Sequence, residues 1–243
     1  MSALLEVEGL TKRFGGVTAV NTCSFAVPQG SVTALVGPNG SGKTTAFNLI
    51  TGYARADAGV VRFAGATVRR PDPVRLSRDG LTRTFQQARI FADLTLVENM
   101  VAALQQPWRS AFRTAVRGHE KTRALELLDE FGLTPLAHER AGNLSYGQKK
   151  LPEFAAVLMG EPRLVLLDEP TAGVNPVLVE QIEARIRELN ARGLTFLVVE
   201  HNMNLVMRLC NPVVVLALGT KLAEGHPDEV RNDSRVLDAY LGG

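Results

Sequence analysis

Two spacings of hydrophobic residues alternate along the chain, and each predicts a different kind of element. Near the N-terminus, the short runs LLEVEGL, VTAV and CSFAV are rich in β-branched and aromatic residues, and the last one ends at the turn Pro28–Gly30. They predict an antiparallel sheet. The next run, Val32–Gly37, is apolar throughout, as in a strand buried on both faces, and the helical pattern AFNLITG follows with Gly52 as a C-cap.

From residue 95 to residue 160 the hydrophobic residues follow a helical period. The segments LTLVENMVAAL and KTRALELLDEFGL each place their apolar residues on one stripe. Beyond this region, apolar strands alternate with helical stretches, in the order Leu164–Asp168, 176–192, Thr195–Glu200, 202–210 and Val213–Leu218. That alternation predicts an α/β fold with a mostly parallel sheet.

These patterns predict one domain over residues 1–243. We expect residues 1–94 and 161–243 to form an α/β core that includes the antiparallel β subdomain. Residues 95–160 are expected to form a helical subdomain inserted into that core.

Composition excludes several classes of protein. A net charge of +2 over 243 residues gives no dense basic face, so nucleic acid is not expected as a partner. The longest apolar run, Val213–Leu218, is too short to cross a bilayer, which does not exclude a membrane-bound partner. Cys23 and Cys210 lack metal-ligand spacing, which favours buried free thiols in a reducing compartment.

A glycine-rich loop between a strand and a helix carries the clearest chemistry. It matches GxxxxGK[ST], and the predicted nucleotide contacts are Gly37, Pro38, Asn39, Gly40, Ser41, Gly42, Lys43, Thr44 and Thr45. Glycines let backbone N–H groups surround phosphate oxygens, and the helix N-terminus adds partial positive charge. Lys43 is predicted to reach the β- and γ-phosphates, and the Thr44 hydroxyl to bind Mg²⁺. The loop therefore predicts ATP and Mg²⁺ as ligands.

Polar residues near the ends of other strands extend this site. Asp168 ends the run LVLLD, at the edge where ligands of parallel sheets bind, and is predicted to hold Mg²⁺. Glu169 follows it, and we expect Glu169 to orient the attacking water or accept its proton. His201 is predicted to lie near the γ-phosphate, and Gln86 to contact Mg²⁺ or the water. Purely structural roles are the alternatives for His201 and Gln86.

The motifs, in their order and spacing, resemble the nucleotide-binding subunit of ABC transporters. The resemblance rests on the loop 37–44, Gln86, the segments LSYGQ (144–148) and LVLLDEP (164–170), and His201. LSYGQ is similar to the family signature LSGGQ, with Tyr146 in place of a glycine. AGVNP (172–176) is similar to the family's D-loop, with Asn175 where an aspartate is commoner. The implied fold is a P-loop NTPase of the ABC ATPase type.

The resemblance also implies a site shared between two subunits. In the family, two subunits pack head to tail, and the signature of one closes over the ATP held by the other. Ser145, Gly147 and Gln148 would then contact the partner's ATP, and a helix N-cap at Ser145 is compatible with this. Phe14 aligns with the aromatic residue that stacks on adenine, although a core phenylalanine is equally plausible.

A finer resemblance concerns the transported substrate. The segments RTFQQARIFADLTLVENM, EHNMNLVM and VLDAYLGG resemble the ATP-binding subunits of branched-chain amino acid importers. This implies a peripheral ATPase at the cytoplasmic face of the membrane, paired with an identical or different second ATP-binding subunit. It would drive integral membrane permease subunits and depend indirectly on a substrate-binding protein. Urea or amide importers and lipid-transporting ABC ATPases share several segments, and a soluble non-transport ABC ATPase is a further alternative.

Pro152 is an unusual residue in the helix that follows the signature. With a helix start near Ser145, Pro152 lies in the second turn, so the bond to the Gln148 carbonyl is missing and a kink is predicted. Two interpretations remain: a tolerated kink, which we favour, or a bend that aims the signature at the γ-phosphate.

Overall fold

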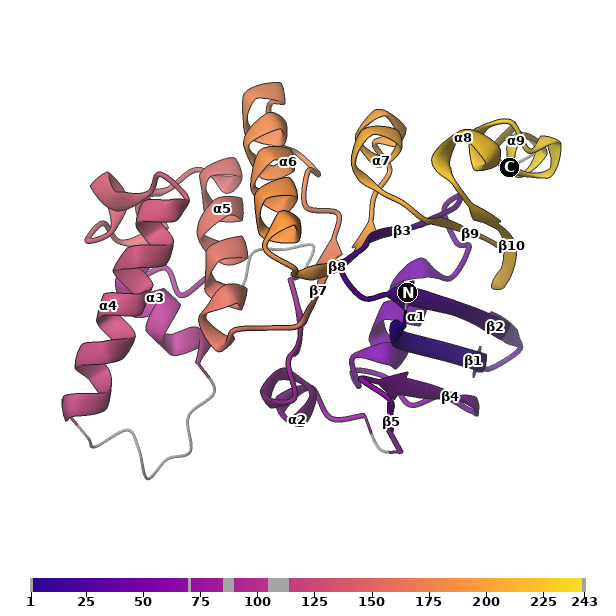
Figure 1. Ribbon diagram of the computed structural model, residues 1–243, viewed down its shortest axis with the longest axis horizontal. Helices are drawn as coiled ribbons and strands as arrows, with labels where there is room; N and C mark the ends of the chain where they lie inside the picture. The colour runs from indigo at the N-terminus through magenta and orange to yellow at the C-terminus, as the bar shows by residue number, and fades with distance from the viewer. Residues whose placement is uncertain (1, 70, 85–89, 105–113, 242–243) are drawn as a thin grey trace.

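Two β-sheets organise the computed structural model, which describes residues 2–69, 71–84, 90–104 and 114–241 (Figure 1). The N-terminal sheet is antiparallel, with strand order β2-β1-β4-β5. Its strands are β1 (Ala3–Phe14), β2 (Val17–Pro28), β4 (Ala58–Phe63) and β5 (Ala66–Thr67). The predicted antiparallel sheet is confirmed, with VTAV and CSFAV forming the single strand β2.

The second sheet has the strand order β10-β9-β3-β8-β7-β6. All neighbours are parallel except β9 and β10, which form an antiparallel hairpin. Its strands are β3 (Val32–Val36), β6 (Leu81–Arg83), β7 (Leu164–Asp168), β8 (Thr195–Val199), β9 (Val213–Ala217) and β10 (Thr220–Gly225). Every residue of β3, β7 and β8 is buried, as the continuous apolar runs predicted.

Helices cover both faces of this parallel sheet. They are α1 (Lys43–Ile50), α2 (Pro73–Arg78), α6 (Pro176–Ala191), α7 (Met203–Leu209), α8 (Pro227–Arg231) and α9 (Ser234–Leu241). Val165 and Leu167 of β7 share a core with Ile182 of α6, while Leu164 of the same strand shares a core with Phe47 of α1. Helix α1 therefore lies between the two sheets, and α6 covers the opposite face (Figure 1).

A group of helices stands at one side of the sheets in Figure 1. It contains α3 (Leu96–Ala103), α4 (Thr114–Glu130) and α5 (Tyr146–Val157), with short 3₁₀ turns at Thr134–Leu136, Ala141–Asn143 and Leu158–Gly160. The ring of Phe154 in α5 meets the ring of Phe196 in β8 edge-on, with centroids 6.2 Å apart. This contact joins the helical group to the sheet.

Helix α5 continues through Pro152 to Val157, so the proline does not end it. The predicted kink stays a prediction. In the described part of the chain, every helix is too short or too polar to span a bilayer.

Candidate functional site

The glycine-rich loop joins the end of β3 to the start of α1, in the context that the motif requires. Its backbone leaves no room for side chains at two glycines. A Cβ on Gly37 would lie 2.1 Å from the Leu216 carbonyl oxygen, and one on Gly42 would lie 2.4 Å from the Ala19 carbonyl oxygen. Both glycines have positive φ angles, 150° and 100°. The loop is therefore closely supported from behind by neighbouring strands.

Lys43 is folded under the loop that precedes it. Its Nζ donates hydrogen bonds to the carbonyl oxygens of Gly37 at 2.8 Å and Pro38 at 2.9 Å, and only 6% of the residue is exposed. Burial lowers the pKa of Lys43, and the negative charges of Glu169 and Asp168 act in the opposite direction. A buried cation beside a close-fitting glycine loop fits the polyphosphate of a nucleotide.

The other predicted loop residues differ in exposure. Asn39, Gly40 and Thr44 are exposed, while Pro38 and Thr45 are half-buried and Ser41 is buried. Thr44 lies in the first turn of α1, so its hydroxyl and the amides of this turn lie at the helix N-terminus. This exposed N-terminus is open to an anion.

Asp168 ends β7 and forms a buried ion pair that the sequence analysis did not predict. Arg83, at the end of the adjacent β6, donates from Nη2 to Asp168 Oδ2 at 2.6 Å, and the two side chains are 6% and 5% exposed. The other guanidinium nitrogen, Nη1, donates to Asn48 Oδ1 at 2.7 Å and to Thr51 Oγ1 at 3.3 Å. Arg83 thus links the predicted metal-binding carboxylate to the last turn of α1. The available sequence signal was an arginine in the short stretch LTR, residues 81–83, which is too common to interpret.

Glu169 and His201 lie together at the same edge of the sheet. His201 Nε2 and Glu169 Oε1 are 3.0 Å apart, and the His201 side chain is 46% exposed. Glu169 has a φ angle of 48°, and its N–H donates to the Val199 carbonyl of the neighbouring β8. The structure therefore brings together the two residues that were predicted as the proton acceptor and the γ-phosphate contact. Gln86, the third predicted catalytic residue, lies outside the described residues.

The signature segment forms the start of α5. Ser145 is the N-cap: its Oγ accepts from the Gln148 N–H, and the Gln148 side chain accepts from the Ser145 N–H at 2.9 Å. Tyr146, which is 48% exposed, lies against the D-loop, since a Cβ on Gly173 would be 3.2 Å from its ring. A Cβ on Gly147 would lie 3.5 Å from the Leu178 side chain and 3.9 Å from the side chain of Val174 in the D-loop. The signature and the D-loop are thus one continuous surface of this chain.

Within one chain, the signature and the glycine-rich loop belong to different layers. Helix α5 stands with α3 and α4, whereas α1 lies between the two sheets (Figure 1).

Phe14 lies at the end of β1 and is 54% exposed, with Lys12 Nζ 5.4 Å from its ring centroid. The interpretation of Phe14 as a core residue is therefore wrong, and adenine stacking stays a prediction.

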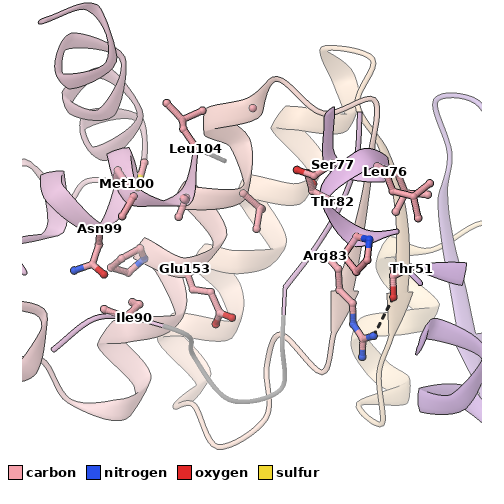
Figure 2. A pocket seen from close by; sticks show the side chains of 18 of the residues that line it. Thr51, Leu76, Ser77, Thr82, Arg83, Ile90, Asn99, Met100, Leu104 and Glu153 are labelled. Atoms are coloured by element: carbon pink, nitrogen blue, oxygen red, sulfur yellow. Dashed lines mark hydrogen bonds between the residues drawn. The ribbon is translucent and has the colours of Figure 1, made fainter. Parts of the chain in front are cut away.

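A groove of about 450 Å³ separates the helical group from the core (Figure 2). Helix α2 and β6 line one wall, with Leu76 and Arg83, and α3 and α5 line the other, with Met100 and Glu153. Pro152 also lines this groove. The groove therefore reaches Arg83, whose guanidinium contacts Asp168.

Two family models match the chain. The model described as ABC transporter covers residues 20–172, and the model described as branched-chain amino acid ATP-binding cassette transporter covers residues 220–243. The chain is 38% identical to the high-affinity branched-chain amino acid transport ATP-binding protein BraF of Pseudomonas aeruginosa, with 98% of both chains covered. It is 37% identical to the similarly described LivG of Salmonella typhimurium, with the same coverage.

Solved structures agree with this relationship. A nucleotide-free ATP-binding cassette from an ABC transporter matches with a TM-score of 0.89 and 34% identity over 100% of both chains. A dimeric cassette in a post-hydrolysis state, bound to ADP and Pi, matches with a TM-score of 0.80 and 27% identity, covering 92% of this chain and 98% of that one. The chain therefore belongs to the ABC transporter family and is one of its nucleotide-binding ATPase cassettes.

Proposed function

We propose that this cassette is the ATP-hydrolysing subunit of an importer for branched-chain amino acids. The proposal rests on the relatives described as branched-chain amino acid transport proteins, which match over nearly their whole length. The observation that supports hydrolysis most directly is the contact between Glu169 and His201, at the sheet edge where Asp168 ends β7.

We assign the described residues of the site to different parts of Mg²⁺·ATP. The loop amides and Lys43 would hold the phosphates, while the Thr44 hydroxyl and Asp168 would hold the metal. Since Arg83 engages Oδ2 of Asp168, we assign Oδ1 to the hydration shell of the ion. Bound Mg²⁺ would neutralise charge on the phosphate oxygens.

Hydrolysis then depends on two side chains that contact each other in the free subunit. Glu169 accepts the proton of the attacking water, and His201 donates a hydrogen bond to the γ-phosphate. In the free subunit, Glu169 Oε1 and His201 Nε2 are 3.0 Å apart, so the water and the γ-phosphate would bind beside an existing contact between the two side chains. Gln86 is assigned to the metal or the water on sequence grounds alone.

We assign the signature to the ATP of a second subunit, since it does not share a layer with the glycine-rich loop of its own chain. Ser145, Gly147 and Gln148 would contact that nucleotide. The groove in Figure 2 is assigned to an integral membrane permease subunit, because it borders both the core and the helical group. With these assignments, we propose that the subunit works at the cytoplasmic face of the membrane and that the substrate-binding protein acts across the bilayer.

The test is reconstitution of the cassette with its membrane subunits and binding protein in liposomes. ATP hydrolysis is expected to rise when leucine, isoleucine or valine is supplied, and Glu169→Gln is expected to keep ATP binding and lose nearly all turnover. An amide preserves the size of Glu169 but cannot take a proton. Stimulation by urea, amides or lipid, in place of amino acids, would overturn the substrate. Near-normal turnover of Glu169→Gln would overturn the site.

A further inference from the structure

Glu200 is a buried carboxylate that directly follows β8, and both of its oxygens accept hydrogen bonds. Oε1 accepts from the N–H of Thr171 at 2.9 Å and from the Thr171 hydroxyl. Oε2 accepts from the N–H of His201 at 2.9 Å and from the N–H of Asn202 at 3.2 Å. Only 4% of Glu200 is exposed.

These bonds connect the two turns that carry the reacting side chains. Thr171 lies two residues after Glu169, and His201 is the residue next to Glu200. A carboxylate offers about four lone-pair sites, and here four donors surround it. A buried charge is tolerated only when it is hydrogen-bonded in this way, so the two turns are held at one separation.

The turn at Glu169 needs such support. Its φ angle of 48° is in the left-handed region, which is strained for a residue with a Cβ. The Glu169 N–H is bonded to β8 through the Val199 carbonyl, and two residues later Thr171 is bonded to Glu200. Both anchors of the turn therefore come from the chain that leads into His201.

We propose that Glu200 is a positioning residue for ATP hydrolysis, which holds Glu169 and His201 at the separation that the reaction needs. The proposal rests on the roles proposed above for Glu169 and His201. Glu200 acts through backbone donors and is not assigned any contact with the nucleotide. A glutamine cannot replace it, because an amide has one acceptor oxygen and its NH₂ group would face N–H donors.

The test uses Glu200→Gln in the cassette assembled with its membrane subunits. We expect kcat to fall on the order of tenfold to a hundredfold, since small displacements of reacting groups have effects of this size. The KM for ATP should stay within about twofold, because the glycine-rich loop and Lys43 are untouched. A matched control is Thr195→Val at the opposite end of β8, where the Thr195 hydroxyl accepts from the Gly30 N–H at 2.9 Å. Like Glu200→Gln, the Thr195→Val variant takes away a buried oxygen that accepts a hydrogen bond from a backbone N–H. The kcat of Thr195→Val should stay near wild type.

A double variant separates positioning from general loss of structure. If Glu200 acts through His201, adding Glu200→Gln to His201→Ala should lower kcat much less than it does in the wild-type background. Full additivity of the two effects, or equal kcat losses in Glu200→Gln and Thr195→Val, would overturn the proposal.

Should Glu200→Gln not fold, Thr171→Val removes only the hydroxyl donor. It should lower kcat at constant KM, and unchanged kcat would overturn the proposal. A Glu169→Gln variant that still hydrolyses ATP would instead overturn the underlying site.

Discussion

Replacing Arg83 by methionine removes the positive partner of a buried ion pair. Because the Arg83 and Asp168 side chains are 6% and 5% exposed, the remaining carboxylate would be left charged in a dry environment. Breaking a buried pair on one side costs about 3–5 kcal/mol of the free energy of unfolding. For a chain of this size about 1 kcal/mol moves the thermal midpoint by about 2–4 °C, so we expect a fall of about 6–20 °C. Methionine keeps an apolar stem but removes the guanidinium, whose central carbon lies 5.4 Å from the centroid of the Phe47 ring, so this contact is lost together with the charge.

The assay is thermal unfolding of the purified subunit, followed by circular dichroism without nucleotide. Arg83→Met combined with Asp168→Asn should regain much of the lost stability, because neither buried charge remains. Arg75→Met is the matched control: Arg75 is 80% exposed and its Nε lies 3.7 Å from Asp79, so its midpoint should not change measurably. A fall in the thermal midpoint of less than about 2 °C for Arg83→Met would refute the reasoning, since the loss of one partner of a buried pair should lower the midpoint by more than that.

Two further predictions concern Lys43 and Pro152. Burial lowers the pKa of Lys43 from its ordinary value of 10.5, so as pH rises through the lowered value the free subunit loses the proton that phosphate binding needs. ATP affinity, measured by titration calorimetry, should fall over the alkaline range below 10.5 with rising proton uptake, and constant affinity there would contradict this. Pro152→Leu restores a backbone N–H inside α5 and should raise the thermal midpoint, by no more than the roughly 3 kcal/mol that an interior proline costs, with hydrolysis little changed. A sharp loss of hydrolysis would show that the bend has a function.

The strands that the sequence predicted well are those buried on both faces. The predicted strand at Thr195–Glu200 is β8 at Thr195–Val199, because an uninterrupted apolar run marks such strands clearly. The strands that were missed are short or exposed. β6 has three residues, and β4 begins with the exposed run Ala58–Val60. Such strands are defined by their pairing with a neighbour, which a local pattern does not contain.

Helix ends were predicted closely where polar caps mark them. The stretch predicted at 176–192 is α6 at Pro176–Ala191, and the Asn175 side chain accepts from the Leu178 N–H at its start. The stretch predicted at 202–210 is α7 at Met203–Leu209, with Asn202 in the same role. In both helices the capping residue acts within its own turn, so it is readable from a few adjacent letters.

The site residues that were predicted lie at strand ends, where the sequence indicates their neighbours. The site residues that were missed have partners far away in the sequence. Glu169 and His201 could be brought together from sequence because the ends of neighbouring parallel strands share an edge. Arg83 could not be predicted, because its partner Asp168 lies 85 residues away, and neither could Glu200, whose partner Thr171 lies 29 residues away. A charged residue is usually exposed, so burial has to be seen before a partner is sought.

The two missed residues stabilise the same short turn from opposite sides. In the sheet, β7 lies between β6 and β8. Arg83, which ends β6, binds Asp168 at the start of the turn, and Glu200, which follows β8, binds Thr171 at its end. Glu169 lies between these two attachments with a left-handed backbone. The residue assigned to the attacking water is therefore held by both neighbouring strands, and a displacement of either strand end would move it relative to the phosphates.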